Sequence, residues 1–401
     1  MGVSKRNPWL FGLGVLLASV ALCQGKARAD VTSDTPGSIV IFPKVIADGT
    51  RDTLIQLTNT SNVGTSAHCW YFNALNDCTP NNFFVDLTPQ QPIWWRVSTG
   101  RATGNPTGVM RCTGGDHRAC SSTNECTTGV CVEASGIFIG NVPQRINFRG
   151  ELKCIQVDVS GVPMAGNSLK GEAILETLDS GQVSEYNGIA IQAMTNPMPT
   201  CVGGPLAGQP CTGQSSCCQD SSCGTCNVVL KLDNNTYNAC PEELIVTHYA
   251  QGATDVFTGA TVNSEITLVP CTEDIENNRP THPDADIDPF LDPDAVIAQF
   301  RVVNEEEEGP LSGGIPFSCW LNVSLDDVRL GGIYDATNVG TFVKTRIPTV
   351  ATAGNGLLGI LEEFHLLGSG PTATAAINMH HGENSRDSGD EIIVPQGTGS
   401  Q

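Results

Sequence analysis

Basic residues are scarce in this sequence, which has 21 Lys and Arg against 42 Asp and Glu. Removal of the segment 1–29, which holds four basic and no acidic side chains, takes the formal net charge from −21 to −25. A surface this acidic repels phosphate backbones, so we expect no nucleic-acid partner. The charge fits a solvated acidic surface or the binding of divalent cations.

Long apolar runs are missing after Ala29, and we therefore expect no transmembrane segment. Long periodic runs rich in Lys, Glu or Leu are missing too. In their place, 43 Gly and 24 Pro separate short β-branched and aromatic segments. This pattern argues against a helical protein and predicts an all-β chain.

Catalytic signatures are a third absence. The sequence contains no Gly-x-Ser-x-Gly and no His-Glu-x-x-His. We therefore expect a non-enzymatic protein. The alternative is a secreted hydrolase or carbohydrate-active enzyme whose site is assembled from distant loops.

The segment 1–29 has the regions of a secretory signal peptide: a basic start, an apolar run from Trp9 to Cys23, and small residues Ala27 and Ala29. We expect cleavage after Ala29 and a secreted, periplasmic or cell-surface protein. A lipoprotein anchored at Cys23 is the alternative, which Leu22 fits poorly because a small residue is expected before such a cysteine. A buried N-terminal helix is a third interpretation.

Cysteine is abundant, and 16 of the 17 cysteines remain once Cys23 leaves with the signal peptide. An even number in an exported chain favours disulfides over free thiols. The disulfide candidates are Cys69, Cys78, Cys112, Cys120, Cys126, Cys131, Cys154, Cys201, Cys211, Cys217, Cys218, Cys223, Cys226, Cys240, Cys271 and Cys319.

Ten of these cysteines lie in two similar segments, 112–131 and 201–226, which both begin Cys-x-Gly-Gly. Neither segment has enough apolar residues for a core, so cross-links must supply its order. The segments resemble short Cys-Gly-Gly modules of secreted bacterial proteins. The second segment ends Cys217-Cys218-x4-Cys223-x2-Cys226, and zinc is the alternative to disulfides there, because a Cys-x2-Cys can hold zinc together with a suitably placed second pair.

The other six cysteines leave their pairing open, because sequence alone does not fix it. Cys69 with Cys78 would close a local hairpin. Cys154 with Cys240, and Cys271 with Cys319, then remain by arithmetic.

Four segments alternate apolar and polar residues, which predicts strands with one buried and one wet face. The buried sets are Phe83, Val85 and Leu87; Ile93, Trp95 and Val97; Ile155, Val157 and Val159; and Val296, Ala298, Phe300 and Val302. The wet sets include Trp94, Arg96, Gln156 and Asp158. Two-layer antiparallel sandwiches require this arrangement.

Four short matches recur in the same order along the chain, which indicates an internal repeat. They pair 54–62 with 299–307, Cys69-Trp70 with Cys319-Trp320, 83–89 with 341–348, and 149–159 with 355–365. Each unit resembles an immunoglobulin-type sandwich in architecture, although the adjacent Cys and Trp depart from antibody spacing. Since neighbouring strand residues face opposite ways, either the two copies bury different members of the pair or one Trp packs against a loop or a neighbouring domain.

The expected organisation is two immunoglobulin-like antiparallel β-sandwich domains, the first interrupted by the two cysteine-rich inserts. It comprises a signal peptide (1–29), a first sandwich (30–270), an acidic proline-rich linker (271–295), a second sandwich (296–396) and a disordered tail (397–401). The run of four glutamates at 305–308 is expected to be a solvated hairpin loop.

The linker offers a calcium site, because closely spaced carboxylates can converge on a hard cation. The candidate ligands are Asp284, Asp286, Asp288, Asp292 and Asp294. An EF-hand is excluded, since Pro289 and Ala295 occupy its glycine and glutamate positions. The alternative is a stiff, solvated linker that binds no metal.

Two further groups are candidate sites. Glu363, His365, His380 and His381 would form a metal or acid-base site if their strands pair. Trp94, predicted to point outward, is a candidate sugar-stacking platform.

Taken together, these features favour an exported structural or binding protein of the cell envelope or surface, such as an adhesion, envelope or filament component. Its expected partners are other surface proteins, polysaccharide or copies of itself. The character of the leader and of the inserts suggests a bacterial source.

Overall fold

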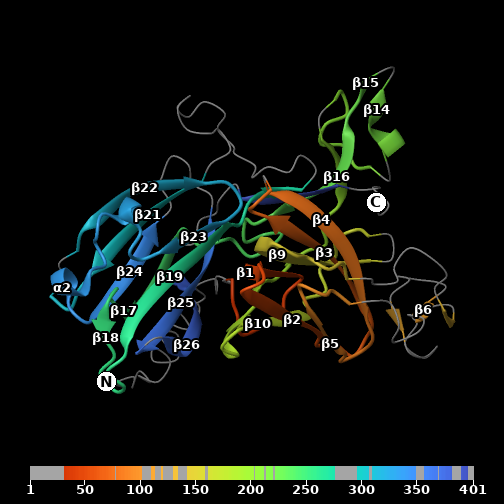
Figure 1. The fold of residues 1–401 in the computed structure, drawn as a ribbon. Coiled ribbons are helices and arrows are strands. Elements are labelled where there is room, and N and C mark those ends of the chain that lie inside the picture. Colours follow the sequence, from red (N-terminus) through yellow and green to blue (C-terminus); the bar gives the residue numbers. More distant parts are fainter. Residues whose placement is uncertain are drawn as a thin grey trace, which may run out of the picture.

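The computed structural model describes residues 31–76, 78–101, 110–112, 119–120, 130–133, 142–158, 161–202, 204–211, 214–219, 222–275, 296–306, 309–348, 356–368, 370–381 and 390–395. Strands form nearly all of the regular structure, and the helical elements are short turns (Figure 1). The all-β prediction is therefore confirmed.

The first sandwich packs two antiparallel sheets face to face. The inner sheet contains, in spatial order, β12 (Ile189–Ile191), β1 (Ile39–Ala47), β9 (Phe148–Val157), β3 (Thr65–Asn73) and β4 (Thr79–Leu87). The outer sheet contains β11 (Gln182–Asn187), β10 (Leu169–Thr177), β2 (Arg51–Asn59) and β5 (Pro92–Arg96). Phe83 and Trp95 face the core between them, as their alternation predicted, and the Trp95 indole donates to the Tyr71 hydroxyl at 2.6 Å.

The second sandwich is built in the same way. The β21 sheet contains β22 (Leu311–Phe317), β21 (Val296–Val303), β24 (Phe342–Pro348), β17 (Glu243–Tyr249) and β27 (His380–His381). The β19 sheet contains β18 (Ala253–Thr254), β19 (Thr261–Pro270), β25 (Leu357–Leu367) and β26 (Gly370–Asn378), with β23 (Leu321–Ser324) paired to β19. The alternating set from Val296 to Val302 faces their shared core, beside η3 (Val328–Leu330) and α2 (Ala336–Val339).

A further sheet, here called the cover sheet, gives the first unit a third layer. It contains β13 (Pro199–Val202), β16 (Thr225–Lys231), β28 (Glu391–Pro395) and β20 (Glu273–Asp274), and β20 runs parallel to β28. It packs on the far face of the inner sheet and encloses a separate third core. That core includes Ile41, Trp70, Phe72 and Ile155 from the inner sheet and Val228, Leu230 and Val394 from the cover sheet.

Layers on both sides of the inner sheet explain why the prediction of a wet face failed at β9. Gln156 was expected to be wet, yet it is 4% exposed, and Cys154 and Ile155 are both fully buried. Cys154 faces the core of the sandwich, whereas Ile155 faces the cover sheet. When both faces of a strand are covered, an alternation of apolar and polar residues does not predict which side chains are exposed to solvent.

The expected domain boundaries also differ from the sheets. The segments 243–249 and 261–270 were placed in the first domain, but β17 pairs with β24 and β19 pairs with β25 of the second sandwich. Residues 271–275, expected in the linker, contribute β20 to the cover sheet. Residues 391–395, expected in the second sandwich, form β28 of that same sheet.

The segments matched in the repeat do not occupy equivalent places. In the first unit 54–62 and 83–89 lie in opposite sheets, through β2 and β4. Their counterparts 299–307 and 341–348 contribute β21 and β24, which are neighbours in one sheet. Short strands of similar composition therefore produced matches that the topology does not share. The turn after Val303 does connect β21 to β22 as a hairpin, as expected for the glutamate run.

Both cysteine-rich inserts contain small strands of their own. The first forms a three-stranded sheet of β6 (Met110–Cys112), β7 (Ala119–Cys120) and β8 (Cys131–Glu133). The second adds η2 (Gln214–Cys217), β14 (Cys218–Gln219) and β15 (Ser222–Cys223), which project from the end of β16 in Figure 1.

Candidate functional site: the junction between the two sandwiches

The second Cys-Trp pair, between β22 and β23, ties the two sandwiches together. Cys319 forms a disulfide with Cys78, which lies in the turn between β3 and β4 of the first sandwich. The next residue, Trp320, donates its indole N–H to the Pro43 carbonyl at 2.8 Å. The expectation that one Trp of the two pairs packs against a neighbouring domain is therefore confirmed for Trp320.

Pro43 lies in a bulge of β1, where the register with β9 shifts between Phe42 and Val45. A bulge re-aims a side chain and leaves backbone groups outside the ladder, and proline supplies no N–H to it. The freed groups are satisfied locally: the Tyr186 hydroxyl accepts from the Lys44 N–H at 3.0 Å and donates to the Lys44 carbonyl at 2.6 Å. The bulge thereby directs the Lys44 side chain toward the second sandwich.

Four charged side chains, here called the Lys44 network, meet at this bulge. Lys44 and Arg51 come from the first sandwich, whereas Glu265 and Glu362 come from β19 and β25 of the second. The Lys44 ammonium lies 2.8 Å from a Glu362 oxygen and also bonds to Glu265. Arg51 lies 2.5 Å from Glu362 and 3.1 Å from Glu265. The Lys44 side chain is fully buried and that of Glu362 is 1% exposed.

Charge balance keeps this network ionised. Burial alone would raise the pKa of Glu362, but the attraction of Lys44 and Arg51 lowers it to about 2. Burial likewise opposes the charge on Glu265, and Lys44 outweighs it, so that the pKa of Glu265 is also lowered. Two cations from one sandwich therefore neutralise two carboxylates from the other.

Edge strands extend the junction. The Ser184 hydroxyl of β11 donates to Glu362 at 2.6 Å. Asn187 and Asn378, at the ends of β11 and β26, exchange two hydrogen bonds of 3.1 and 2.7 Å. These contacts cover two strand edges that would otherwise offer unpaired backbone groups to other chains.

The structure corrects all three predicted pairings outside the inserts. Cys69 pairs with Cys154, which lies directly opposite on the neighbouring strand. Cys78 pairs with Cys319, as described above. Cys240 pairs with Cys271. Cys69 and Cys78 do not close a hairpin because Cys69 points across the inner sheet toward β9.

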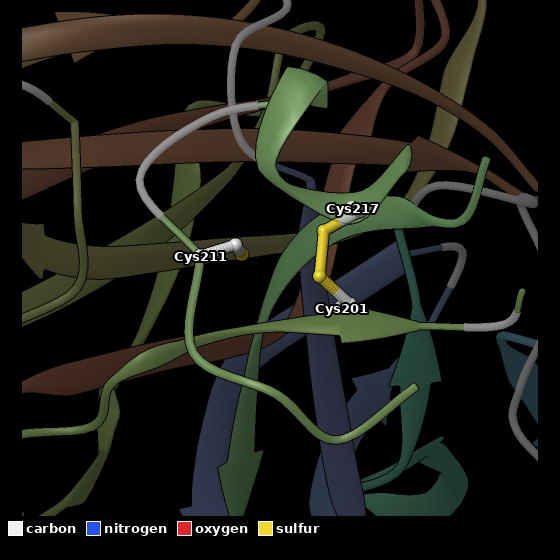
Figure 2. A group of neighbouring side chains, drawn as sticks. All are labelled: Cys201, Cys211 and Cys217. Atoms are coloured by element: carbon white, nitrogen blue, oxygen red, sulfur yellow. A yellow bond between two sulfur atoms is a disulfide. The ribbon is translucent and has the colours of Figure 1, made fainter. Parts of the chain in front are cut away.

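The second insert is held by disulfides, and the zinc alternative is wrong. Cys201, Cys211 and Cys217 have their sulfur atoms within 4.8 Å of one another, but Cys201 is bonded to Cys217 (Figure 2) and Cys211 to Cys226. Sulfur in a disulfide is not the thiolate that zinc requires. The buried cluster of this insert is its four paired cysteines with Leu206 against them, so cross-links replace a core, as predicted.

All eleven cysteines whose side chains the structure describes are disulfide-bonded, and they include Cys218. The side chains of Cys112, Cys120, Cys126, Cys131 and Cys223 lie outside the described residues. The proposed calcium ligands Asp284, Asp286, Asp288, Asp292 and Asp294 also lie outside them.

The histidine cluster does not form. His380 and His381 pair with β17, whereas Glu363 and His365 lie farther along β25. The register of β25 with β26 places Ala373, seven residues before His380, opposite His365, so the two histidines lie ~24 Å apart along the strands. His365 instead contacts Asp255 at 3.1 Å.

Trp94 points outward as predicted, at 60% exposed, and it lies opposite Gln56 on the outer sheet. Glu172 flanks Gln56 on the other side, so an indole, an amide and a carboxylate form one row across three strands. Beside this row lies a hollow of about 270 Å³. Its lining residues are Gln56, Thr58, Thr60, Lys170, Gly171 and Glu172. We call this surface the Trp94 face.

The sequence alone does not predict the Lys44 network, although it contains one signal of it. Lys44 lies in the otherwise apolar strand "IVIFPKVIA", where an unpaired charge would be costly. The Pro43-Lys44 step marks the bulge. The sequence does not predict that Lys44 pairs with Glu265 and Glu362, because both lie far away in the chain.

No protein-family model and no curated protein sequence matches this chain. Within the described part of the chain, no helix is long and apolar enough to cross a membrane.

Proposed function

We propose that this chain is an exported structural or binding protein of the cell envelope or surface, in which two immunoglobulin-like sandwiches act as one rigid unit. The observation that carries the proposal is the junction. A disulfide, a buried four-charge network and paired edge strands join the sandwiches within one chain. Relative motion is the default for two domains of one chain, and a disulfide together with a buried ionic network restricts it, so the junction favours a fixed geometry.

Export is supported by the cysteines and the leader together. Eleven disulfide-bonded cysteines suit an oxidising compartment, because cytosolic thiols are kept reduced. The segment 1–29 has the signal-peptide pattern, with cleavage after Ala29. A protein exposed to proteases and mechanical load gains from covalent links between its sheets.

Expression of the complete chain in an exporting bacterial host tests this proposal. We expect a mature N-terminus at Asp30, and a non-reducing peptide map that contains Cys69–Cys154, Cys78–Cys319 and Cys240–Cys271. The control is the chain without the segment 1–29, which should stay in the cytoplasm. A full-length chain retained inside the cell with free thiols would contradict the proposal.

A second candidate function, polysaccharide binding, is favoured by the Trp94 face. A sugar ring offers an apolar face to an indole and hydroxyls to amide and carboxylate groups, and the row from Trp94 to Glu172 presents all three. Sedimentation with insoluble cell-wall polysaccharides should show binding that Trp94→Ala abolishes. Val183→Ala is the matched control, since Val183 is exposed on β11 of the same sheet. Release of soluble sugars would instead favour the carbohydrate-active enzyme.

A further inference from the structure

Three charged side chains, here called the Lys153 triad, are completely buried in the third core. Lys153 and Glu151 lie on β9, and Glu273 comes from β20 of the cover sheet. The Lys153 ammonium lies 2.5 Å from a Glu273 oxygen and 2.7 Å from a Glu151 oxygen, and all three side chains are 0% exposed. The ammonium also lies 4.8 Å from the centre of the Phe72 ring.

The triad has one cation for two carboxylates, in a core that water does not reach. Burial raises the pKa of Glu151, which the attraction of Lys153 only partly offsets and the repulsion of Glu273 reinforces, to about 8. Glu151 is therefore a neutral acid at pH 7. Burial lowers the pKa of Lys153, but the two carboxyl groups outweigh it and raise it, so the Lys153 ammonium stays charged, 2.5 Å from Glu273.

Each carboxyl group also has one oxygen without a hydrogen-bond partner: Oε2 of Glu151 and Oε1 of Glu273. A buried acceptor left unsatisfied costs free energy, and a buried ion costs more. A product in which Lys153 and Glu273 carry no charge would remove most of that cost. The free-energy cost of the buried charges therefore favours a reaction between Lys153 and Glu273.

We propose that Lys153 and Glu273 condense into an intramolecular isopeptide bond, with Glu151 relaying the protons. The bond would join the inner sheet to the cover sheet through side chains alone. It needs no oxidant or cofactor, since its reactants are an ammonium and a carboxylate and its products are an amide and one water molecule.

The ammonium passes one proton to the Glu273 carboxylate, which gives a neutral amine and a neutral acid in place of two buried ions. The Nζ lone pair attacks Cδ of Glu273, and the C–N bond forms as the carbonyl oxygen takes a proton from Glu151. The C–OH bond then breaks as the other hydroxyl passes its proton to the departing one, which leaves as water, and Nζ gives its second proton to Glu151. Glu151 ends as it began.

The Lys44 network provides a comparison within the same chain. Lys44 also contacts two buried carboxylates, but Arg51 neutralises the second charge and holds the pKa of Glu362 at about 2. No neutral acid is present there to relay protons, so Lys44 is expected to keep its free amine.

Mass spectrometry of the exported chain, reduced and alkylated under denaturing conditions, tests the proposal. We expect an intact mass lower than that of the alkylated sequence by one water molecule. Trypsin should leave the peptide 150–170 uncut at Lys153 and joined to the peptide that contains Glu273, while cleavage after Lys44 proceeds. An unmodified mass with cleavage after Lys153 overturns the proposal, as does a water loss that maps to a cyclic imide of Asp without joined peptides.

Two variants separate the reaction from the fold. Lys153→Arg keeps the charge and cannot condense, so it should show the full mass. Glu151→Gln keeps the size of the side chain and removes the relay, so it should show the full mass with an unchanged circular dichroism spectrum. Joined peptides at the wild-type level in Glu151→Gln would overturn the relay. If the wild type lacks the isopeptide bond, the disulfide-linked junction is unaffected. Failure of this proposal can therefore be distinguished from failure of the proposed function.

Discussion

Lys44 and Lys153 are both fully buried, and each contacts two carboxyl groups, yet the two surroundings differ in charge balance. The Lys44 network adds Arg51 and is neutral with all four groups ionised. The Lys153 triad has no second cation among the described residues and holds one surplus carboxyl group in an apolar core. The pKa of Glu362 is accordingly lowered to about 2, whereas that of Glu151 is raised to about 8.

This difference shows that the ratio of cations to carboxyl groups, more than burial, decides whether a buried lysine forms a stable ion pair or is placed to react. A balanced network is an ionic lock that fixes two surfaces in one orientation, although such pairs add little net stability. In a network with a surplus carboxyl group, that group must stay protonated, or the lysine must react with a carboxyl group. The first kind lies at the junction of the sandwiches and the second lies between the stacked layers of the first unit.

The largest effect is expected from Lys44→Met. Removal of this cation leaves Glu362 buried with Arg51 as its one remaining cation, and breaking a buried pair in this way typically lowers the free energy of unfolding by about 3–5 kcal/mol. Urea denaturation followed by circular dichroism measures the loss. Lys231→Met is the control, because Lys231 is exposed and should change stability by less than about 0.5 kcal/mol. Equal losses in the two variants would refute the ionic lock.

A smaller loss is expected from removal of the disulfide at the junction by Cys78→Ala with Cys319→Ala. The bridge closes a long loop, with a sequence separation of 241, and loss of a native disulfide typically costs about 2–5 kcal/mol. Guanidinium denaturation should show a lower midpoint and still one transition, because the Lys44 network remains. Two separated transitions would show that the disulfide alone joins the sandwiches.

The pH dependence of stability should separate the two sites, because Glu362 and Glu151 should change the free energy of unfolding with pH in opposite directions. The pKa of Glu362 falls from 4.5 to about 2 on folding, so its contribution is present above pH 4.5 and is lost as the pH falls toward 2. The pKa of Glu151 rises from 4.5 to about 8, so its contribution is present below pH 4.5 and is lost as the pH rises toward 8.

Unfolding free energies of Glu362→Gln and Glu151→Gln, measured between pH 3 and 9 in the Lys153→Arg background, which cannot form the isopeptide bond, test these signs. We expect the first variant to flatten the acid limb of the background profile and the second to flatten the decline above pH 4.5. Changes of the same sign in both variants would mean that the two sites do not differ in charge balance.

The smallest effect on stability is expected from Trp94→Ala, which tests an exposed position against the buried ones. Trp94 is 60% exposed, so its removal should change the free energy of unfolding by less than about 0.5 kcal/mol in the same urea assay. A loss as large as that in Lys44→Met would place Trp94 in a structural contact and weaken the case for the Trp94 face as a binding surface.

Local alternation in the sequence predicted much of the fold. It placed Phe83 and Trp95 in the core and Trp94 outside, because each of these strands has one face in solvent. The same reasoning failed at Gln156, which lies on the Cys154 face inside the first sandwich, while the cover sheet buries the opposite face of β9. That sheet is assembled from strands far apart in the chain, from β13 to β28, and alternation within one strand carries no information about such a layer.

The site was less predictable than the fold, for the same physical reason. Sequence identified which cysteines to expect in disulfides, but Cys78–Cys319 spans two sandwiches and depends on how they dock. Lys44 and Lys153 are visible as charges in apolar strands. Their partners come from other sheets, so the charge balance that separates the two sites exists only after folding.

Differential scanning calorimetry of the exported chain tests most directly whether the two sandwiches form one unit. We predict a single transition in which the calorimetric and van't Hoff enthalpies agree, because the junction couples both cores. Two transitions, or a van't Hoff enthalpy larger or smaller than the calorimetric one, would contradict a single cooperative unit.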